Sequence, residues 1–206
     1  MKPTHHPSDD TLTAYAVGAL EPGFGLVTGA HIEMCGACRA KVRRFEAVSG
    51  ETLEALAPAA LEGEAWARME ARLDGQAALA PLQQSTRPLL ERLPLKPRKW
   101  VGPGLWVAAV DTPHHPDNRV YLLGAARGAP TARHTHTGAE FCTVLQGAFH
   151  DELGMFQAGD FAQTDSADEH QPIVEGREEC ICLFATEGRL KAKGAIGRLA
   201  FRYADV

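Results

Sequence analysis

The sequence predicts an α+β protein of two domains, a small helical bundle at the N-terminus and an all-β barrel at the C-terminus. Residues 8–75 carry apolar side chains at helical spacing. From about Trp100 the pattern changes to short apolar or β-branched runs, separated by turns that contain Gly, Pro, Asp or His. The segment between them is punctuated by proline. We therefore expect a helical domain over 1–75, a linker over 76–94 and a β domain over 95–206.

The overall composition excludes several classes of protein. Of the 206 residues 45% are apolar and 23% are charged, which is typical of a folded globular chain. The net charge is −5, and acidic residues outnumber basic ones both before and after residue 90, so direct binding of nucleic acid is not expected. The longest apolar stretches fall well short of the roughly 20 residues that span a bilayer, so no membrane association is expected.

The N-terminal segment and the cysteine content predict where the protein works. Residues 1–7 lack the apolar core of a signal peptide, so we expect a cytoplasmic protein. Because that compartment keeps thiols reduced, the five cysteines are expected to be metal ligands, redox groups or small buried residues.

Four helices are expected in the first 75 residues. Ser8 is expected to cap the first helix, because two aspartates follow it and suit the positive end of the helix dipole. Glu21-Pro22-Gly23 should end that helix after Leu20. The others are expected at about Phe24–Met34, from after Cys38 to Pro58, and around Trp66, Met69 and Leu73. Phe45 and Leu53 should be core residues, whereas Trp66 and Met69 fit either the core or a surface that binds a partner.

A first group of metal ligands lies at the end of the second helix. His31, Cys35 and Cys38 form an H-x3-C-x2-C string. In one continuous helix they share a face, and with a turn at Gly36 they form a zinc knuckle completed by His31. His5 and His6 are both candidates for the fourth ligand. The competing interpretation is two small buried cysteines and a surface histidine; we favour zinc, since about 75 helical residues build only a few kcal/mol of core stability.

A second group lies in the β domain. Gly128, His134, His136, Glu140 and Gly147 form the string G-x5-H-x-H-x3-E-x6-G. Residues i and i+2 of a strand share a face, so both histidines are expected to point inward, and Glu140 should enter from the start of the next strand. His170 is the candidate for a fourth ligand from a later strand, with His114, His115 and His150 as rivals expected at the surface. Zinc or another divalent metal suits this set.

The second string resembles the first cupin motif, in which a small β barrel holds one metal with three histidines and one glutamate. Residues 159–170 resemble a second motif without its usual Pro-x-Gly. Together, the two groups resemble the ChrR-type zinc-binding anti-sigma factors over nearly the whole chain. The segments that carry this resemblance are His5-His6-Pro-Ser-Asp, Leu12-Thr-Ala-Tyr, His31 to Cys38, the His-x-His, Val144 to Phe149, and Cys180-Ile-Cys182-Leu.

This resemblance implies a function and a set of roles. The helical domain would bind an extracytoplasmic-function sigma factor as a heterodimer, and the cupin domain would sense singlet oxygen or organic hydroperoxide and trigger release. The zinc ligands would be His6, His31, Cys35 and Cys38, and the cupin ligands His134, His136, Glu140 and His170. Cys180 and Cys182 would match a cysteine pair common in the family, as redox groups or as two buried core residues. From strand alternation, Cys142 should lie near the metal, as an oxidation target or a wall residue.

Two other functions remain as alternatives. The chain could be a cupin metalloenzyme, a dioxygenase or isomerase, with an accessory zinc domain, although a helical zinc module has no role in cupin chemistry. A zinc-buffering or DNA-binding protein is the third interpretation, and the charge balance argues against DNA. We expect no catalytic residues and favour regulation.

Overall fold

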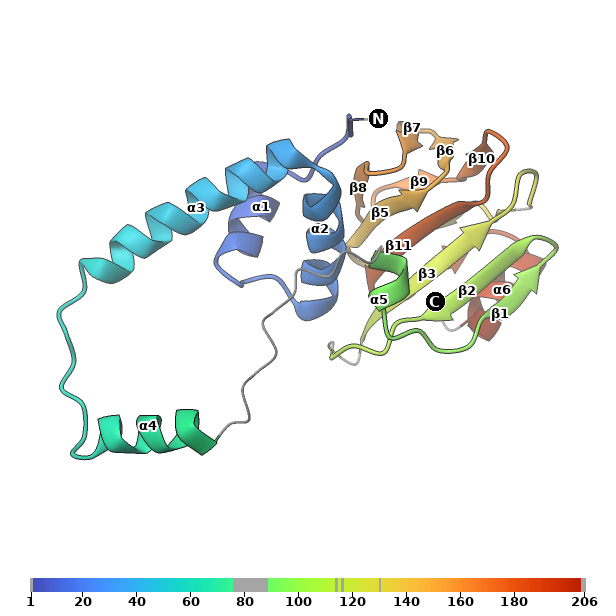
Figure 1. The fold of residues 1–206 in the computed structure, drawn as a ribbon. Helices are drawn as coiled ribbons and strands as arrows, with labels where there is room; N and C mark the ends of the chain where they lie inside the picture. Colours follow the sequence, from blue (N-terminus) through green and yellow to red (C-terminus); the bar gives the residue numbers. More distant parts are fainter. Residues whose placement is uncertain (1, 76–88, 114, 116, 130, 205–206) are drawn as a thin grey trace.

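The computed structural model describes residues 2–75, 89–113, 115, 117–129 and 131–204, and it confirms the predicted fold class. Helices fill the N-terminal part, and strands fill most of the C-terminal part, which ends in a helix that the sequence analysis did not predict (Figure 1). The helices are α1 Asp9–Ala16, α2 Pro22–Met34, α3 Gly36–Glu54, α4 Ala65–Gly75, α5 Leu89–Arg92 and α6 Ala195–Ala204. Most of the predicted linker, together with His114, lies outside the described residues.

The first helix ends, and the second begins, slightly earlier than the sequence pattern predicts. Ser8 caps α1 as expected, since its side chain accepts a hydrogen bond from the backbone N–H of Thr11. The helix ends at Ala16 rather than after Leu20, because Gly18 takes a left-handed conformation with φ of 68°. Pro22 then starts α2 instead of separating two helices, which suits a residue without a backbone N–H at the first helical position.

Twelve strands in the described part of the chain form three antiparallel sheets. They are β1 Lys99–Gly102, β2 Leu105–Ala109, β3 Asn118–Ala125, β4 His134–Thr135, β5 Glu140–Gln146, β6 Ala148–Asp151, β7 Gly154–Gln157, β8 Phe161–Thr164, β9 Glu169–His170, β10 Ile173–Glu175, β11 Cys180–Glu187 and β12 Lys191–Ala192. The largest sheet has the order β1-β2-β3-β11-β5-β8, and the smaller sheets have the orders β10-β6-β7 and β12-β4-β9.

The central strands of the large sheet are buried on both faces, which explains their nearly continuous apolar runs. Along β5, Phe141 and Thr143 face the N-terminal helices, whereas Glu140 and Cys142 face the interior of the β domain. Strands β3 and β11 alternate in the same way, so one sheet separates two apolar cores. Gly147 closes the turn after β5 with φ of 72°, as the motif predicts.

Helix α2 packs the helical part of the chain against the β part. It lies along the outer face of the large sheet (Figure 1), and its side chains Phe24, Val27 and Ala30 belong to the same buried cluster as the outward residues of the strands. The ring of Phe24 meets Phe141 edge-on at 4.7 Å, and the hydroxyl of Thr143 donates to the carbonyl of Val27. The helical part and the β part therefore share a core.

Helices α3 and α4 reach away from this core (Figure 1). The prediction that Leu53 is a core residue is wrong, because its side chain is 69% exposed on the last turn of α3, where the helix has left the bundle. Phe45, closer to the bundle, is partly buried as expected. Trp66 and Met69 on α4 are exposed. Among the described helices, none has the length and apolar character needed to cross a membrane.

Candidate metal centres

Four potential ligands converge where the N-terminal segment, α2 and α3 meet. One ligand atom from each of His6, His31, Cys35 and Cys38 lies within 4.8 Å of the other three. The chain breaks between α2 and α3 at Cys35, whose backbone is extended, and Gly36 is already the first residue of α3. The ligands therefore do not lie on one continuous helix, and the turn of the knuckle arrangement falls one residue earlier than predicted. Nδ1 of His6 lies 3.5 Å from Sγ of Cys35 and 3.4 Å from Sγ of Cys38. His5 points away from this group and contacts Asp160 and Phe156 instead.

The buried His31 has one ring nitrogen fixed and the other left for a ligand. Its Nδ1 lies 2.7 Å from the carbonyl oxygen of Gly159, which can only accept, so Nδ1 carries the proton. Burial lowers the pKa of His31 to about 4, which keeps the ring neutral. Nε2 is therefore a bare lone pair, and it is buried without a hydrogen-bond partner among the described residues. An orphaned acceptor beside two thiols is what a bound cation would satisfy.

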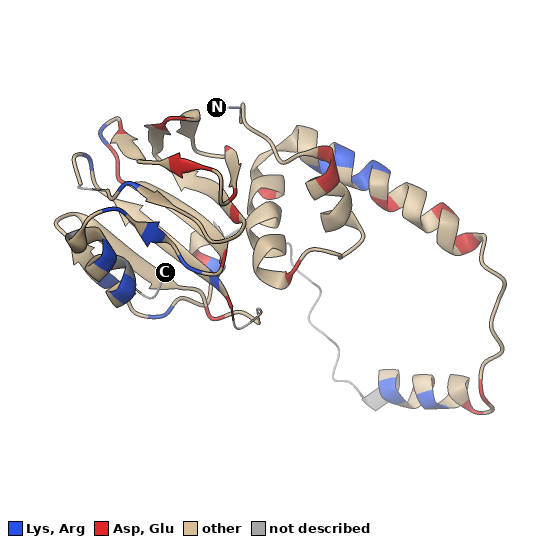
Figure 2. Ribbon diagram, turned by 180° about the vertical axis from the view of Figure 1, so that it is seen from behind, with Lys and Arg blue, Asp and Glu red and all other residues tan. Residues whose placement is uncertain are grey.

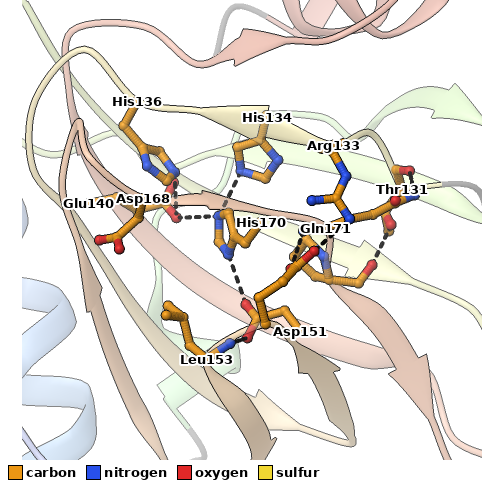
Figure 3. A network of polar contacts seen from close by, with 12 residues as sticks. Thr131, Arg133, His134, His136, Glu140, Asp151, Leu153, Asp168, His170 and Gln171 are labelled. Carbon is orange, nitrogen blue, oxygen red and sulfur yellow. Dashed lines mark hydrogen bonds and ion pairs between the residues drawn. The ribbon is translucent and has the colours of Figure 1, made fainter.

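The second group forms inside the β domain (Figure 3). His134 on β4 pairs with His170 on β9, His136 follows β4, and Glu140 begins β5. All four side chains are buried, and their ligand atoms lie within 4.8 Å of one another. Nε2 of His134 and Nε2 of His170 are 3.1 Å apart, and Oε1 of Glu140 lies 3.3 Å from Nε2 of His136.

Each of these three histidines donates its Nδ1 proton to a group behind it. His134 donates to the carbonyl of Ala132, at 2.9 Å, and His136 to the carbonyl of Asp165, at 3.3 Å. His170 donates to the carboxylate of Asp151, at 2.8 Å, as Figure 3 shows. All three Nε2 lone pairs are thereby turned to the centre, which is the usual arrangement around a bound metal.

The electrostatics of this cluster also fit a cation. Burial would raise the pKa of Glu140, but the hydrogen bond to His136 and the charges of all three histidines together outweigh burial and lower it. At His136 burial would lower the pKa, but Glu140, the Asp165 carbonyl and the charge of Asp168 together outweigh burial and raise it. Burial lowers the pKa of His134. A buried carboxylate and histidine nitrogens that converge within 4.8 Å suit a divalent metal. Oε2 of Glu140 has no hydrogen-bond partner among the described residues.

A cavity of about 630 Å³ adjoins this cluster inside the β domain. Its walls are mainly apolar and include Val107, Tyr121 and Leu123, and small residues of α6 close one side. Cys142, Cys180 and Cys182 also face it, as strand alternation predicts, and Sγ of Cys180 lies 3.7 Å from Sγ of Cys182. All three thiols are buried and have raised pKa values, so they are protonated at neutral pH. The main cause is burial for Cys142, the contact with Cys182 for Cys180, and the contact with Cys142 for Cys182.

The rival histidines that the structure describes lie outside both groups. The side chain of His115 is 62% exposed, and that of His150 is 41% exposed and pairs with Glu175. The sequence analysis missed two buried carboxylates that support the clusters, Asp151 and Asp160. No sequence signal marks them, because each acts on a histidine or a chain segment that only the tertiary fold brings close.

Comparison with known proteins agrees with these observations. A family profile described as the ChrR Cupin-like domain matches residues 96–190. The anti-sigma-E factor ChrR of Cereibacter sphaeroides is 36% identical over 209 residues, which cover 95% of each chain. A crystal structure of Rhodobacter sphaeroides SigE in complex with the anti-sigma ChrR matches with a TM-score of 0.76 and 38% identity, over 90% of this chain and all of that one. The chain therefore belongs to the ChrR family of anti-sigma factors.

Proposed function

We propose that this protein is a cytoplasmic anti-sigma factor, which binds an extracytoplasmic-function sigma factor through a zinc-bound helical domain and keeps it from RNA polymerase. The observation that carries the proposal is the convergence of His6, His31, Cys35 and Cys38 at the start of α3, the helix that leads to a set of exposed apolar side chains. It is supported by the solved relative, which is a complex of an anti-sigma factor with SigE.

The donor set of the helical cluster favours zinc in a structural role. Two thiols and two imidazoles are a common ligand set for structural zinc. When bound, zinc would fix the N-terminal segment, α2 and α3 to one another. The cluster is backed by only a small core around Leu12, Ile32 and Val42, so the helical part depends on its ligands for stability.

The surface that fits the sigma factor lies on α3, α4 and the chain between them. Its large apolar side chains are between 53% and 78% exposed. They are Val48, Leu53, Leu56, Leu61, Trp66, Met69 and Leu73. A group of this size on extended helices is typical of a protein interface. Basic positions are distributed over α3, α4 and α6 rather than gathered on one face (Figure 2), which favours a protein partner over nucleic acid.

The cupin domain would supply the response to oxidative stress. We infer that His134, His136, Glu140 and His170 hold zinc or another divalent metal, and that singlet oxygen or an organic hydroperoxide acts in this domain to release the sigma factor. The cavity beside the cluster gives a small apolar oxidant a place next to the ligands. The raised pKa values of Cys142, Cys180 and Cys182 argue that these thiols react only after the domain has loosened.

A cupin metalloenzyme is the second candidate, and the same cavity favours it because His134, Glu140 and His170 line its wall. The two functions differ in which cluster they need. A dioxygenase or isomerase would lose turnover when His134 is replaced and would not need Cys38. An anti-sigma factor would lose its partner when Cys38 is replaced and would keep it when His134 is replaced.

The test is affinity capture of the full chain from its native cells, followed by mass spectrometry of the bound proteins. The variants are Cys38→Ser and His134→Ala, with Cys142→Ser as a matched control that replaces a buried thiol outside the helical cluster. We expect a sigma factor with the wild type, His134→Ala and Cys142→Ser, and none with Cys38→Ser. Absence of a sigma factor from the wild-type capture would contradict the proposal and favour the enzyme.

A further inference from the structure

The turn between β7 and β8 belongs to the cupin domain, yet it touches the helical metal cluster. Its residue Gly159 gives the carbonyl that fixes Nδ1 of His31 at 2.7 Å. Gly159 has φ of 94°, and a side chain there would collide with Pro3, so the turn tolerates only glycine. The carbonyl is therefore held in place by the conformation of the cupin turn and not by the helices.

The next residue of the turn, Asp160, holds the N-terminal segment that carries His6. Its carboxylate is completely buried. Oδ1 accepts the backbone N–H groups of Thr4, at 2.6 Å, and His5, at 3.0 Å, while Oδ2 accepts the N–H of Gln157 and closes the turn. The N–H of Phe161 on β8 donates to the carbonyl of His5 at 3.1 Å. The N-terminal segment is thus docked on the cupin domain immediately before the ligand His6.

We propose that Asp160 and the Gly159 carbonyl are positioning groups of the helical metal site, so that the cupin domain supplies part of that site's support. This inference rests on the proposed metal site and adds to it the residues that orient two of its four ligands. Gly159 orients the ring of His31, and Asp160 sets the path of the chain into His6. Outer groups of this kind typically change metal affinity by about 10- to 100-fold when they are lost.

Strand β8 connects Asp160 to the metal cluster of the cupin domain. Strand β8 starts directly after Asp160 and pairs with β5, where Thr164 lies opposite Glu140. The carbonyl of Asp165, the next residue, accepts the Nδ1 proton of His136. Four strand residues span about 13 Å. Asp160, which positions the helical cluster, therefore lies just before β8, and Asp165, which positions His136 of the cupin cluster, lies just after it. A shift of β8 would displace groups that orient ligands of both metal sites.

The test uses cobalt(II) bound to the full chain as a probe of the helical site. Thiolate ligands give cobalt(II) a near-ultraviolet charge-transfer band, and the cupin cluster contains no thiol, so the band reports the cluster that holds Cys35 and Cys38. The measurement is the rate at which a chelator removes this band. The first variant is Asp160→Asn, and Thr143→Val is its matched control, since it removes another buried hydrogen bond between the two parts of the chain.

A second pair of variants keeps the inference testable if Asp160→Asn fails to fold. Thr4→Pro removes the N–H that donates to Asp160, whereas Thr4→Ala keeps it; Thr4 lies outside any helix or strand, and circular dichroism checks the fold. We expect cobalt loss at least tenfold faster for Asp160→Asn and Thr4→Pro, and within about twofold of wild type for both controls. Equal rates in all five proteins would overturn this inference alone. A wild type without the thiolate band would overturn the proposed metal site, and with it this inference.

Discussion

Replacement of Phe24 by alanine tests whether α2 joins the helical part to the β domain. The ring is 9% exposed and meets Phe141 edge-on at 4.7 Å across the face of the large sheet. Phe→Ala changes in protein cores cost about 3–5 kcal/mol, and the slight exposure places Phe24 near 3 kcal/mol. For a chain of this length that corresponds to roughly 6–12 °C in the melting temperature.

The assay is urea unfolding of the metal-loaded full chain, followed by far-ultraviolet circular dichroism. Val48→Ala is the matched control, because Val48 is an apolar helical residue on α3 with 63% exposure, and its change should stay within about 0.5 kcal/mol. If Phe24→Ala falls within about 1 kcal/mol of the control, α2 is not packed on the sheet as described, and coupling between the two parts through this helix is refuted.

Three further predictions concern single buried groups. Asp151→Asn should weaken metal binding at the cupin cluster by about 10- to 100-fold, measured by competition with a chelator, because the carboxylate that accepts the Nδ1 proton of His170 is lost. Gly124→Ala should cost about 1–3 kcal/mol of unfolding free energy and shift the tryptophan fluorescence, because the buried Trp106 ring covers Gly124. Burial would raise the pKa of Asp160 above its ordinary value of 3.8, but backbone N–H donors outweigh burial and lower it. The ionised carboxylate therefore stabilises the fold fully at any pH above 3.8. The stability difference between wild type and Asp160→Asn, measured in chelator, should therefore shrink as the pH falls through the lowered pKa.

A specific result would contradict each of these three predictions. Asp117→Asn is the control for Asp151→Asn, because the side chain of Asp117 is 83% exposed. If the two variants retain metal equally well, Asp151 does not support the cupin cluster through His170. Gly50→Ala on α3 meets no atom within 4 Å and should stabilise the helix by up to about 1 kcal/mol, so a loss there equal to that at Gly124 would mean a nonspecific effect. A stability difference for Asp160→Asn that persists unchanged into acid would show that its charge is not what holds the N-terminal segment.

Local spacing made most of both clusters predictable from the sequence. His31, Cys35 and Cys38 lie within eight residues, and the pair His134 and His136 needs only strand alternation. Glu140 and Gly147 followed from the same string. Residue spacing left His5 and His6 open, because a chain end before a helix can fold back in several ways, and the resemblance selected His6, which the structure brings to the cluster.

The connection between the two parts was not predictable, for physical reasons. Phe24, Val27 and Ala30 have the spacing of any amphipathic helix, and nothing local tells whether such a face packs on other helices or on a sheet. Leu53 shows the opposite error, since an apolar residue at helical spacing was assigned to a core that the helix had already left. Asp160 was missed because two of its backbone donors, Thr4 and His5, lie in the distant N-terminal segment.

Transcription in vitro tests the central claim most directly. The reaction contains RNA polymerase, the sigma factor captured with this protein and a promoter that depends on that factor. We predict that the zinc-loaded full chain abolishes the transcript when it is equimolar with the sigma factor, and that Cys38→Ser leaves the transcript in place. Undiminished transcription at a large excess of the wild-type chain would contradict the account.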